Sequence, residues 1–431
     1  MERYDSYKDS GVESLGIVPE SWKTSRFKYH HIELDDTVGE DSNSYPLLSL
    51  TKGGVIFRDV ESGKGKFPES FENYKIVEKN NLIFCLYDIE ETPRTVGISE
   101  NNGMITGSYK IFKTKNSVIP KFTYYTYLVI DDVKGLKPYY TGLRNVVRPE
   151  TFKNLPLNIP TIQEQQQIVE YLDEQTQLID SLIKKTGRKI ELLKEKRTSL
   201  INEVVTKGLN PNVEMKDSGV EWIGKIPSHW ETIKLKYQGE VIIGLSYSPE
   251  NVVDEGEEST LVMRSSNVQN GKTSFNDNVF VNCDIPDKLR TRESDILICS
   301  RNGSRRLIGK NCLIQKKHEG LTWGVFMTVY RSRSPKFFYW LLNSPVFESQ
   351  SGLFLTSTIN QLTVSTLENM VVPFVSDIHE QQQIVEYLDE QTQKIDKTIS
   401  IEEKRIKLLK EYRSSLISEV VTGKRKVTTN E

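Results

Sequence analysis

An internal duplication constrains this chain more than any other feature. The fourteen residues EQQQIVEYLDEQTQ stand at positions 164–177 and return letter for letter at 380–393, 216 positions later. A shorter repeat precedes each copy, because DSGVE occurs at 9–13 and again at 217–221. Self-similarity of this kind marks a repeated structural unit. We therefore predict two copies of one unit, each with a short leading segment, a long middle region and a helical end.

The middle regions differ from each other, since residues 30–155 share little sequence with residues 238–372. Two similar frames thus carry two divergent inserts, an arrangement that suits a pseudo-twofold molecule with two different recognition surfaces. The predicted domains are residues 1–160 with the leading segment 9–24, a helical spacer at 161–208, residues 209–376 with the leading segment 217–232, a second spacer at 377–424 and a polar tail at 425–431.

The composition is that of a globular protein, with 37% hydrophobic and 27% charged residues among 431. No apolar run approaches the roughly 18 residues that cross a bilayer, and the start MERYDSYKDS is polar, which predicts a cytoplasmic protein without a membrane partner. The net charge of −2 does not favour nucleic-acid binding by the whole chain, yet acidic residues concentrate in the repeats and Arg in the inserts. The near-neutral net charge therefore does not exclude a basic surface on one of the inserts.

Both repeats predict long helices. Thr161 with Glu164, and Asp377 with Glu380, fit the capping box, in which the first residue caps the helix and the Glu reaches back. Glycines at 208 and 423 mark the ends, so each helix spans about 42 residues, roughly 60 Å. Whether Gly187 breaks or bends the first helix stays open.

Apolar and semi-apolar residues recur every three or four positions along both predicted helices. The predicted seam consists of Ile168, Leu172, Gln175, Ile179, Leu182, Ile190, Leu193, Leu200 and Val204, matched by Ile384, Leu388, Gln391, Ile395, Ile406, Leu409, Leu416 and Val420. Such a narrow seam needs a partner, and we predict an antiparallel intramolecular coiled coil. The alternative is that each helix packs on its own domain. The two Gln residues are expected to fix the register or to contact another subunit.

Each insert is predicted to be mixed α/β, with a buried strand at 81–85 and at 295–299. A polar loop follows each strand, at 87–97 and at 300–306. Arg and Asn in the second loop are side chains that fork onto guanine and adenine edges, although a solvated turn is the alternative. Aromatic clusters at 124–127 and 337–340 have helical spacing, which indicates core rather than base stacking.

Candidate DNA contacts are Arg, Lys and polar residues in such loops. The predicted set is Lys64, Lys66, Arg94, Arg144, Asn145, Arg148, Arg264, Asn267, Arg301, Asn302, Ser304, Arg305, Arg306, Asn360 and Gln361.

No catalytic signature is found. GxxxxGK[ST], GxGxxG and the Asn/Asp-Pro-Pro-aromatic pattern of amino-methyltransferases do not occur, and the five histidines form no HExxH. The four cysteines show no CxxC pair and no zinc-ligand spacing, so we expect buried free thiols and no metal site. The chain is predicted to be non-catalytic.

The whole chain resembles the specificity subunits of Type I restriction-modification enzymes. The resemblance rests on SGVEWIGKIPSHW at 218–230 with its weaker copy SGVESLGIVPESW at 10–22, and on EQQQIVEYLDEQT and LLKEKRTSLINEVVT with their second copies. The weaker copy has Ser14-Leu15 where the other has Trp222-Ile223, which leaves the symmetry of packing there open.

The resemblance implies that each insert is a target-recognition domain for one half of a split double-stranded DNA target. The helices would space the domains and dock two modification subunits, which bind S-adenosylmethionine and methylate adenine. Two restriction subunits would supply ATP- and Mg²⁺-dependent translocation and cleavage, and this chain would bind no cofactor. Alternatives are a coiled-coil adaptor that does not bind DNA and a self-contained nuclease or methyltransferase. The sequence leaves the target and the spacer length open.

Overall fold

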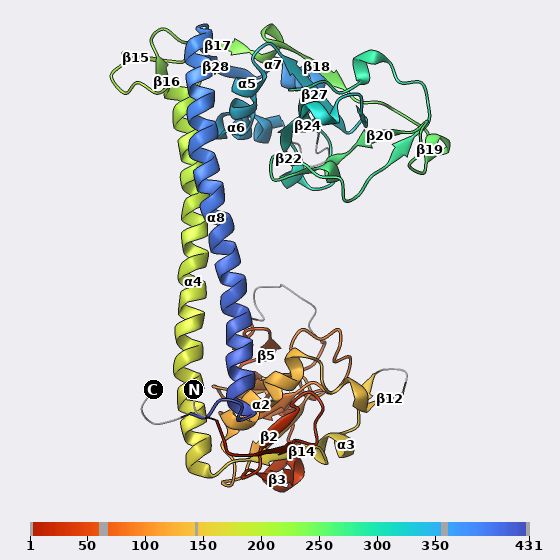
Figure 1. Cartoon of the computed structure of the whole chain (residues 1–431), viewed down its shortest axis with the longest axis vertical. Coiled ribbons are helices and arrows are strands. Elements are labelled where there is room, and N and C mark those ends of the chain that lie inside the picture. The colour runs from red at the N-terminus through yellow and green to blue at the C-terminus, as the bar shows by residue number, and fades with distance from the viewer. Residues whose placement is uncertain (1–2, 60–67, 143–144, 355–360, 428–431) are drawn as a thin grey trace. The chain divides into compact units, whose positions relative to one another are not determined.

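The computed structural model describes residues 3–59, 68–142, 145–354 and 361–427. The chain divides into two compact units, of which the first unit contains residues 1–187 and 404–431 and the second unit contains residues 188–403. Each unit contains one insert and part of both long helices, α4 (Ile162–Lys207) and α8 (Ile378–Val421) (Figure 1). The two units therefore share the helical spacers that the sequence predicted as separate segments.

Both long helices follow their predicted bounds. α4 has 46 residues and α8 has 44, and α4 runs through Gly187 without a break. A single Gly destabilises a helix by about 1 kcal/mol relative to Ala, which is too little to break a helix of this length. Gly208 and Gly423 follow the helix ends with φ of 72° and 66°, the left-handed conformation in which Gly terminates helices.

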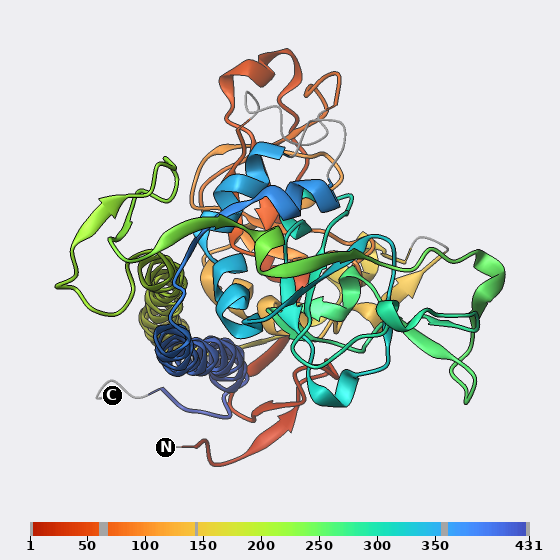
Figure 2. The ribbon, with the colours of Figure 1, turned by 90° about the horizontal axis from the view of Figure 1, so that it is seen from above.

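The helices pair antiparallel, as predicted. In the second unit, Lys189 Nζ donates to Glu402 Oε1 at 2.5 Å and Arg197 Nε donates to Asp396 Oδ1 at 2.9 Å, so position numbers rise on α4 as they fall on α8. In the first unit, Arg413 Nε lies 3.0 Å from Asp180 Oδ1. Figure 1 and Figure 2 show the two helices side by side.

The predicted seam is largely confirmed. Its buried members are Ile168, Leu172, Ile179, Ile190, Val204, Ile384, Leu388, Ile395, Leu416 and Val420, whereas Leu193, Leu200, Ile406 and Leu409 are half-buried. In the first unit the α4 and α8 side chains join one core cluster with the insert. Each helix thus packs on its copy and on an insert, which combines the two alternatives.

The predicted seam shifts by one position at Leu182, and a buried Thr follows each of its two Gln residues. Gln175 and Gln391 are half-buried, while Thr176 and Thr392 one position later are buried, and each hydroxyl donates at 2.6 Å to the carbonyl four residues earlier. Leu182 is 40% exposed because the stripe passes through Ile183. A 3.6-residue period drifts against a fixed spacing, so such shifts of one position are expected.

Each insert contains a four-stranded sheet, and the two sheets have the same topology despite the divergent sequences. The first unit has the strand order β4-β11-β8-β9 and the second has β18-β27-β24-β25, with every neighbouring pair antiparallel. The bounds are β4 His31–Leu34, β11 Lys110–Thr114, β8 Leu82–Phe84, β9 Val96–Ile98, β18 Gly239–Ile243, β27 Met327–Ser332, β24 Ile296–Cys299 and β25 Asn311–Leu313. β8 and β24 are wholly buried, as predicted.

Shorter elements complete each unit. The first unit adds the pairs β1 Tyr7–Asp9 with β2 Ile17–Pro19, β3 Lys23–Arg26 with β14 Pro156–Ile159, β5 Leu48–Thr51 with β6 Gly54–Phe57, β7 Lys75–Val77 with β10 Gly103–Ile105 and β12 Tyr140–Thr141 with β13 Val146–Val147, and the helices α1 Phe27–His30, α2 Pro120–Asp132 and α3 Pro149–Lys153.

The second unit repeats part of this plan. It adds β15 Met215–Asp217 with β16 Lys225–Pro227, β17 Glu231–Lys234 with β28 Val371–Phe374, β21 Val268–Gln269 with β22 Lys272–Thr273, a second sheet of β19 Val252–Val253, β23 Phe280–Val281, β20 Thr260–Met263 and β26 Thr322–Trp323, and the helices α5 Pro335–Leu342, α6 Pro345–Phe354 and α7 Val364–Asn369. The aromatic clusters lie on α2 and α5 and are mainly core, as predicted.

The leading segments dock on the helices through one repeated contact. Trp22 Nε1 donates to Glu164 Oε1 at 3.0 Å in the first unit, and Trp230 Nε1 donates to Glu380 Oε1 at 2.9 Å in the second. The predicted capping boxes are therefore half right. Thr161 and Asp377 accept from backbone N–H groups of the first turns, but the Glu carboxylates hold the buried indoles, whose N–H groups need an acceptor.

The two leading segments pack differently at the departure noted in the sequence. Leu15 and Ile223 are both buried, whereas Trp222 is 42% exposed. Ser14 lies against Gly135, where an added Cβ would approach its Oγ to 2.3 Å. Ser14 in the first copy therefore packs closely on Gly135, whereas its counterpart Trp222 lies at the surface.

Candidate functional site

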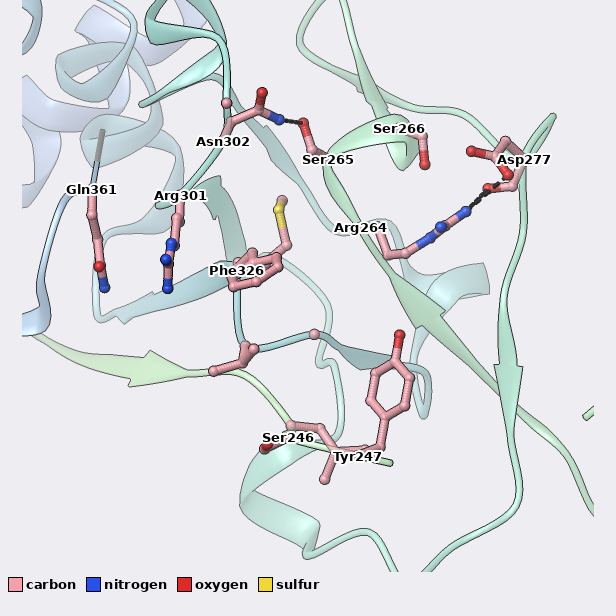
Figure 3. Close-up of a pocket in the computed structure, with 15 residues that line it drawn as sticks. Ser246, Tyr247, Arg264, Ser265, Ser266, Asp277, Arg301, Asn302, Phe326 and Gln361 are labelled. Carbon is pink, nitrogen blue, oxygen red and sulfur yellow. Dashed lines mark hydrogen bonds and ion pairs between the residues drawn. The ribbon is translucent and has the colours of Figure 1, made fainter. Parts of the chain in front are cut away.

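A pocket of about 1200 Å³ opens in the second unit where β24 ends. Four predicted contacts line it together, namely Arg264, Arg301, Asn302 and Gln361 (Figure 3). They come from three separate segments of the second insert. The other labelled residues around the pocket are Ser246, Tyr247, Ser265, Ser266, Asp277 and Phe326.

Backbone hydrogen bonds fix the edge of this pocket. The N–H groups of Ser300 and Arg301 donate to the Phe326 carbonyl at 3.1 and 3.0 Å, and Leu362 N–H donates to the Ser300 carbonyl at 2.8 Å. Arg301 and Gln361 form an isolated antiparallel bridge. Because Leu362 is buried, the segment that carries Gln361 is anchored in the core.

Arg301 and Gln361 present their side chains to the pocket. The Arg301 guanidinium carbon lies 5.1 Å from the centre of the Phe326 ring, which is 54% exposed. Such a cation–π contact orients a guanidinium without using its N–H donors. Within the described part of the chain, neither the guanidinium nor the Gln361 amide has a hydrogen-bond partner. None of the described residues therefore uses the hydrogen-bonding capacity of these two groups.

The neighbouring polar residues of the pocket use part of their hydrogen-bonding capacity within the protein. Arg264 Nη2 donates to Asp277 Oδ1 at 2.8 Å, which offsets much of its charge. Asn302 donates to Ser265 Oγ at 3.0 Å and accepts from Ser304 N–H at 2.9 Å, so it shapes its own turn. Both line the pocket, but with fewer free donors than Arg301.

Asn267 was predicted as a contact, and the structure gives it a different role. It is fully buried, accepts from Arg264 N–H at 2.8 Å and donates to the Ser274 carbonyl at 3.0 Å. An amide so enclosed holds the loop together. Ser304, Arg305 and Arg306 are exposed just beyond the pocket lining, and Asn360 lies outside the described residues.

The first unit has an equivalent edge with different chemistry. Val147 N–H donates to the Leu86 carbonyl at 2.8 Å, as Leu362 does to Ser300, which places Tyr87 where the other unit has Arg301. The Tyr87 ring stacks on Tyr109 with centroids 6.3 Å apart, and its hydroxyl lies 3.0 Å from Ser108 Oγ. Burial raises the pKa of Tyr87, so its hydroxyl stays protonated.

Tyr87 was not among the predicted contacts. The signal that identifies it is the alignment of the two buried strands, because Tyr87 and Arg301 each stand two residues after the matched cysteines at 85 and 299. The four cysteines are free, as predicted. Cys85, Cys299 and Cys312 are also buried as predicted, whereas Cys283 is only half-buried.

Arg94 also has a structural role. Its Nη1 lies 2.9 Å from both Asp131 Oδ2 and Asp132 Oδ1. Burial alone would lower the pKa of Arg94, but the hydrogen bond to Asp132 and the charges of both carboxylates raise it instead. This ion pair ties the segment just before β9 to α2 and engages the guanidinium.

The remaining predicted contacts of the first insert are placed as follows. Asn145 is exposed with φ of 48°, and Arg148 is exposed at the start of α3. Lys64, Lys66 and Arg144 lie outside the described residues.

Neither a metal-binding cluster nor a membrane-spanning helix is present among the residues that the structure describes. No three His, Cys, Asp or Glu side chains gather there in a way that would hold a metal ion. No described helix is long and apolar enough to cross a membrane.

Comparisons with known proteins agree on one class. Residues 41–192 match the family "Type I restriction modification DNA specificity domain". The Type I restriction enzyme MjaVIII specificity subunit of Methanocaldococcus jannaschii is 23% identical, with 98% of this chain and 97% of that protein covered. The StySPI specificity subunit of Salmonella potsdam is 26% identical over 46% of this chain and 44% of its own length.

Solved structures share the fold at low sequence identity. A chain from a study of complex assembly and conformational transition of the type I R-M system superimposes with a TM-score of 0.71 at 14% identity, covering 94% of this chain and 98% of that one. The HsdS subunit from Thermoanaerobacter tengcongensis gives 0.53 at 14% identity, covering 95% and 98%.

Proposed function

We infer that this chain belongs to the specificity subunits of Type I restriction-modification enzymes, and we propose that each insert reads one half of a split DNA target. The observation that carries the proposal is that the two inserts have sheets of the same strand order with different side chains at the equivalent edge. Tyr87 occupies that edge in the first unit, and Arg301 in the second. A shared scaffold with divergent edges is what two readers of different sequences require. The comparisons do not favour the adaptor alternative.

The candidate contacts are those that the fold leaves available. In the second unit these are Arg264, Arg301, Asn302, Ser304, Arg305, Arg306 and Gln361, and in the first unit Tyr87, Asn145 and Arg148. We leave Arg94 and Asn267 out because their side chains are enclosed in the fold. Arg and Lys contacts to phosphates make DNA binding weaken with salt.

We further propose that the chemistry resides in partner chains. Two modification subunits, docked on α4 and α8, would bind S-adenosylmethionine and methylate adenine. Two restriction subunits would use ATP and Mg²⁺ for translocation and cleavage. This chain would then contribute recognition without a cofactor of its own, and the assembly would act in the cytoplasm.

The deciding experiment is to co-express this chain with a Type I modification subunit from the same genome and to map N6-methyladenine in the host DNA by single-molecule sequencing. Two short fixed blocks around an unread spacer would support the proposal and give both half-sites. A stable complex that adds no methylation would contradict it.

The length of the paired helices is expected to set the unread spacer. Insertion of four residues into α4, with four into the facing part of α8, adds about 6 Å to the pair. The spacer should then lengthen by one or two base pairs at about 3.4 Å each. The same methylation map measures this, and an unchanged spacer would show that the helices do not determine it.

A further inference from the structure

Arg301 and Gln361 are two long polar side chains of the pocket that have no hydrogen-bond partner among the described residues, and backbone hydrogen bonds hold both of their segments. The isolated antiparallel bridge sets the two residues directly opposite each other. Residues so paired have Cβ atoms about 5 Å apart on the same face. Figure 3 shows the two side chains side by side and pointing the same way.

This spacing suits two neighbouring base pairs. Successive bases along a strand are about 3.4 Å apart, and long side chains that start about 5 Å apart converge on that distance readily. The two residues also carry complementary chemistry. A guanidinium forks onto O6 and N7 of guanine, and a Gln amide forks onto N6 and N7 of adenine.

The pair is held in place before any ligand binds. Phe326 supports the guanidinium at 5.1 Å, and its carbonyl accepts from the N–H of Arg301 at 3.0 Å. Leu362 anchors Gln361, since it is buried and its N–H bonds the Ser300 carbonyl at 2.8 Å. A guanidinium that is already positioned loses less entropy on binding, and the fixed backbone of Gln361 limits where its amide can reach, which favours reading bases over loose attraction to phosphate.

We propose that Arg301 and Gln361 form a paired base reader in which Arg301 recognises a guanine and Gln361 an adenine in adjacent base pairs of one half-site. The inference rests on the proposed function and deepens it. Arg264 differs, because Asp277 already takes one of its donors, and Asn302 differs because it holds its own turn.

The test uses the full chain in complex with its modification subunits and a library of randomised duplex DNA, with the bound fraction sequenced. Arg301→Ala is expected to reduce the preference for guanine at one position by roughly 5- to 150-fold, and Gln361→Ala to do the same for adenine at the adjacent position. The other half-site should keep its preferences in both variants.

Arg301→Lys is the matched variant, since it keeps the charge but loses the fork. Loss of guanine preference in Arg301→Ala, with a weaker preference in Arg301→Lys because a Lys ammonium also donates to O6 and N7 but without the fixed fork, would support a base contact. Uniform weakening on all sequences in Arg301→Ala, restored by Arg301→Lys, would identify a phosphate contact and overturn the proposal.

Two further results separate this inference from the proposed function. A wild-type complex with a split preference that neither alanine variant alters would refute the paired reader and leave the function intact. A wild-type complex without sequence preference would refute both. Thermal unfolding of each variant checks the fold, and Lys317→Ala, at an exposed position of the same unit that is neither in the pocket nor a candidate contact, serves as the control for general loss of charge.

Discussion

The edges that follow β8 and β24 occupy the same place in two sheets of identical strand order, yet one presents stacked tyrosines and the other an Arg beside a Gln. The backbone hydrogen bonds behind the edges match, at 2.8 Å from Val147 to Leu86 and 2.8 Å from Leu362 to Ser300. The difference teaches that the fold depends on buried strands and frame contacts, whereas the exposed edge is free to vary.

Exchange of an insert is the strongest way to test this separation. Replacing residues 27–155 by residues 235–370 joins equivalent positions, because Phe27 N–H donates to the Leu155 carbonyl just as Leu235 N–H donates to the Met370 carbonyl, both at 3.1 Å. We expect both halves of the methylated target to carry the same bases, with one original half lost. A change in the half read by the untouched insert would show that the two edges are not independent.

The shared frame should be equally sensitive in both units. Trp22 and Trp230 are buried, and both indoles bond a Glu at the start of a long helix. Trp22→Ala and Trp230→Ala are each expected to lower the free energy of unfolding of their own unit by about 3–5 kcal/mol. Hydrogen exchange in each unit measures this. Trp222→Ala, at an exposed position, is the control, and a large loss in only one unit would break the equivalence of the frames.

Acid should distinguish the units. His31 is buried against Phe27, with ring centroids 3.8 Å apart, and burial lowers the pKa of His31 to about 4. The corresponding position, four residues after the matched Phe27 and Leu235, is Gly239 in the second unit. Between about pH 6.5 and 4 the unfolded His binds a proton that the folded His does not, so the first unit loses stability as the pH falls.

We expect this loss to reach about 2 kcal/mol at pH 5 relative to pH 7. Hydrogen exchange at both pH values, corrected for its intrinsic pH dependence, should show the decrease in the first unit beyond any change common to both. In His31→Gln the pH dependence should become similar in the two units. An equal response of both units in the unaltered chain would rule out this role of His31.

The smallest expected difference lies in the helix pair. Glu402 is buried and bonds Lys189, whereas the position 216 residues earlier holds a buried Thr186. Lys189→Ala should cost about 1 kcal/mol, because the Lys side chain is half exposed and other contacts of Glu402 remain. Denaturant unfolding measures the loss. The double variant with Glu402→Thr should recover most of it, and Lys196→Ala, on the exposed face, should change little.

Sequence alone predicted the features that local pattern determines. Caps and terminal glycines placed α4 and α8 within a residue or two, and apolar runs identified β8 and β24, because these signals lie inside the elements themselves. The antiparallel pairing followed from the need of a narrow seam for a partner.

What depends on distant contacts was not predictable. Gln361 meets Arg301 across 60 positions, and nothing local to either residue encodes that bridge. Arg94, like Arg301, lies in a polar loop that follows a buried strand, but in the fold it pairs with Asp131 and Asp132 of α2. The hydrogen-bond partner of the Glu164 carboxylate likewise depends on the position of Trp22, which lies 142 residues earlier in the chain.

The division of the chain also sets an order of assembly during synthesis. The second unit is one continuous stretch, 188–403, whereas the first needs residues 404–431 to complete its core with Leu416, Ile417 and Val420. At about 5–20 residues per second, the ribosome takes roughly 10–40 s to make the intervening segment. The part translated first is therefore finished last, and a nascent chain that stops short of residue 404 leaves the apolar face of α4 around Leu172 without the cover that α8 provides.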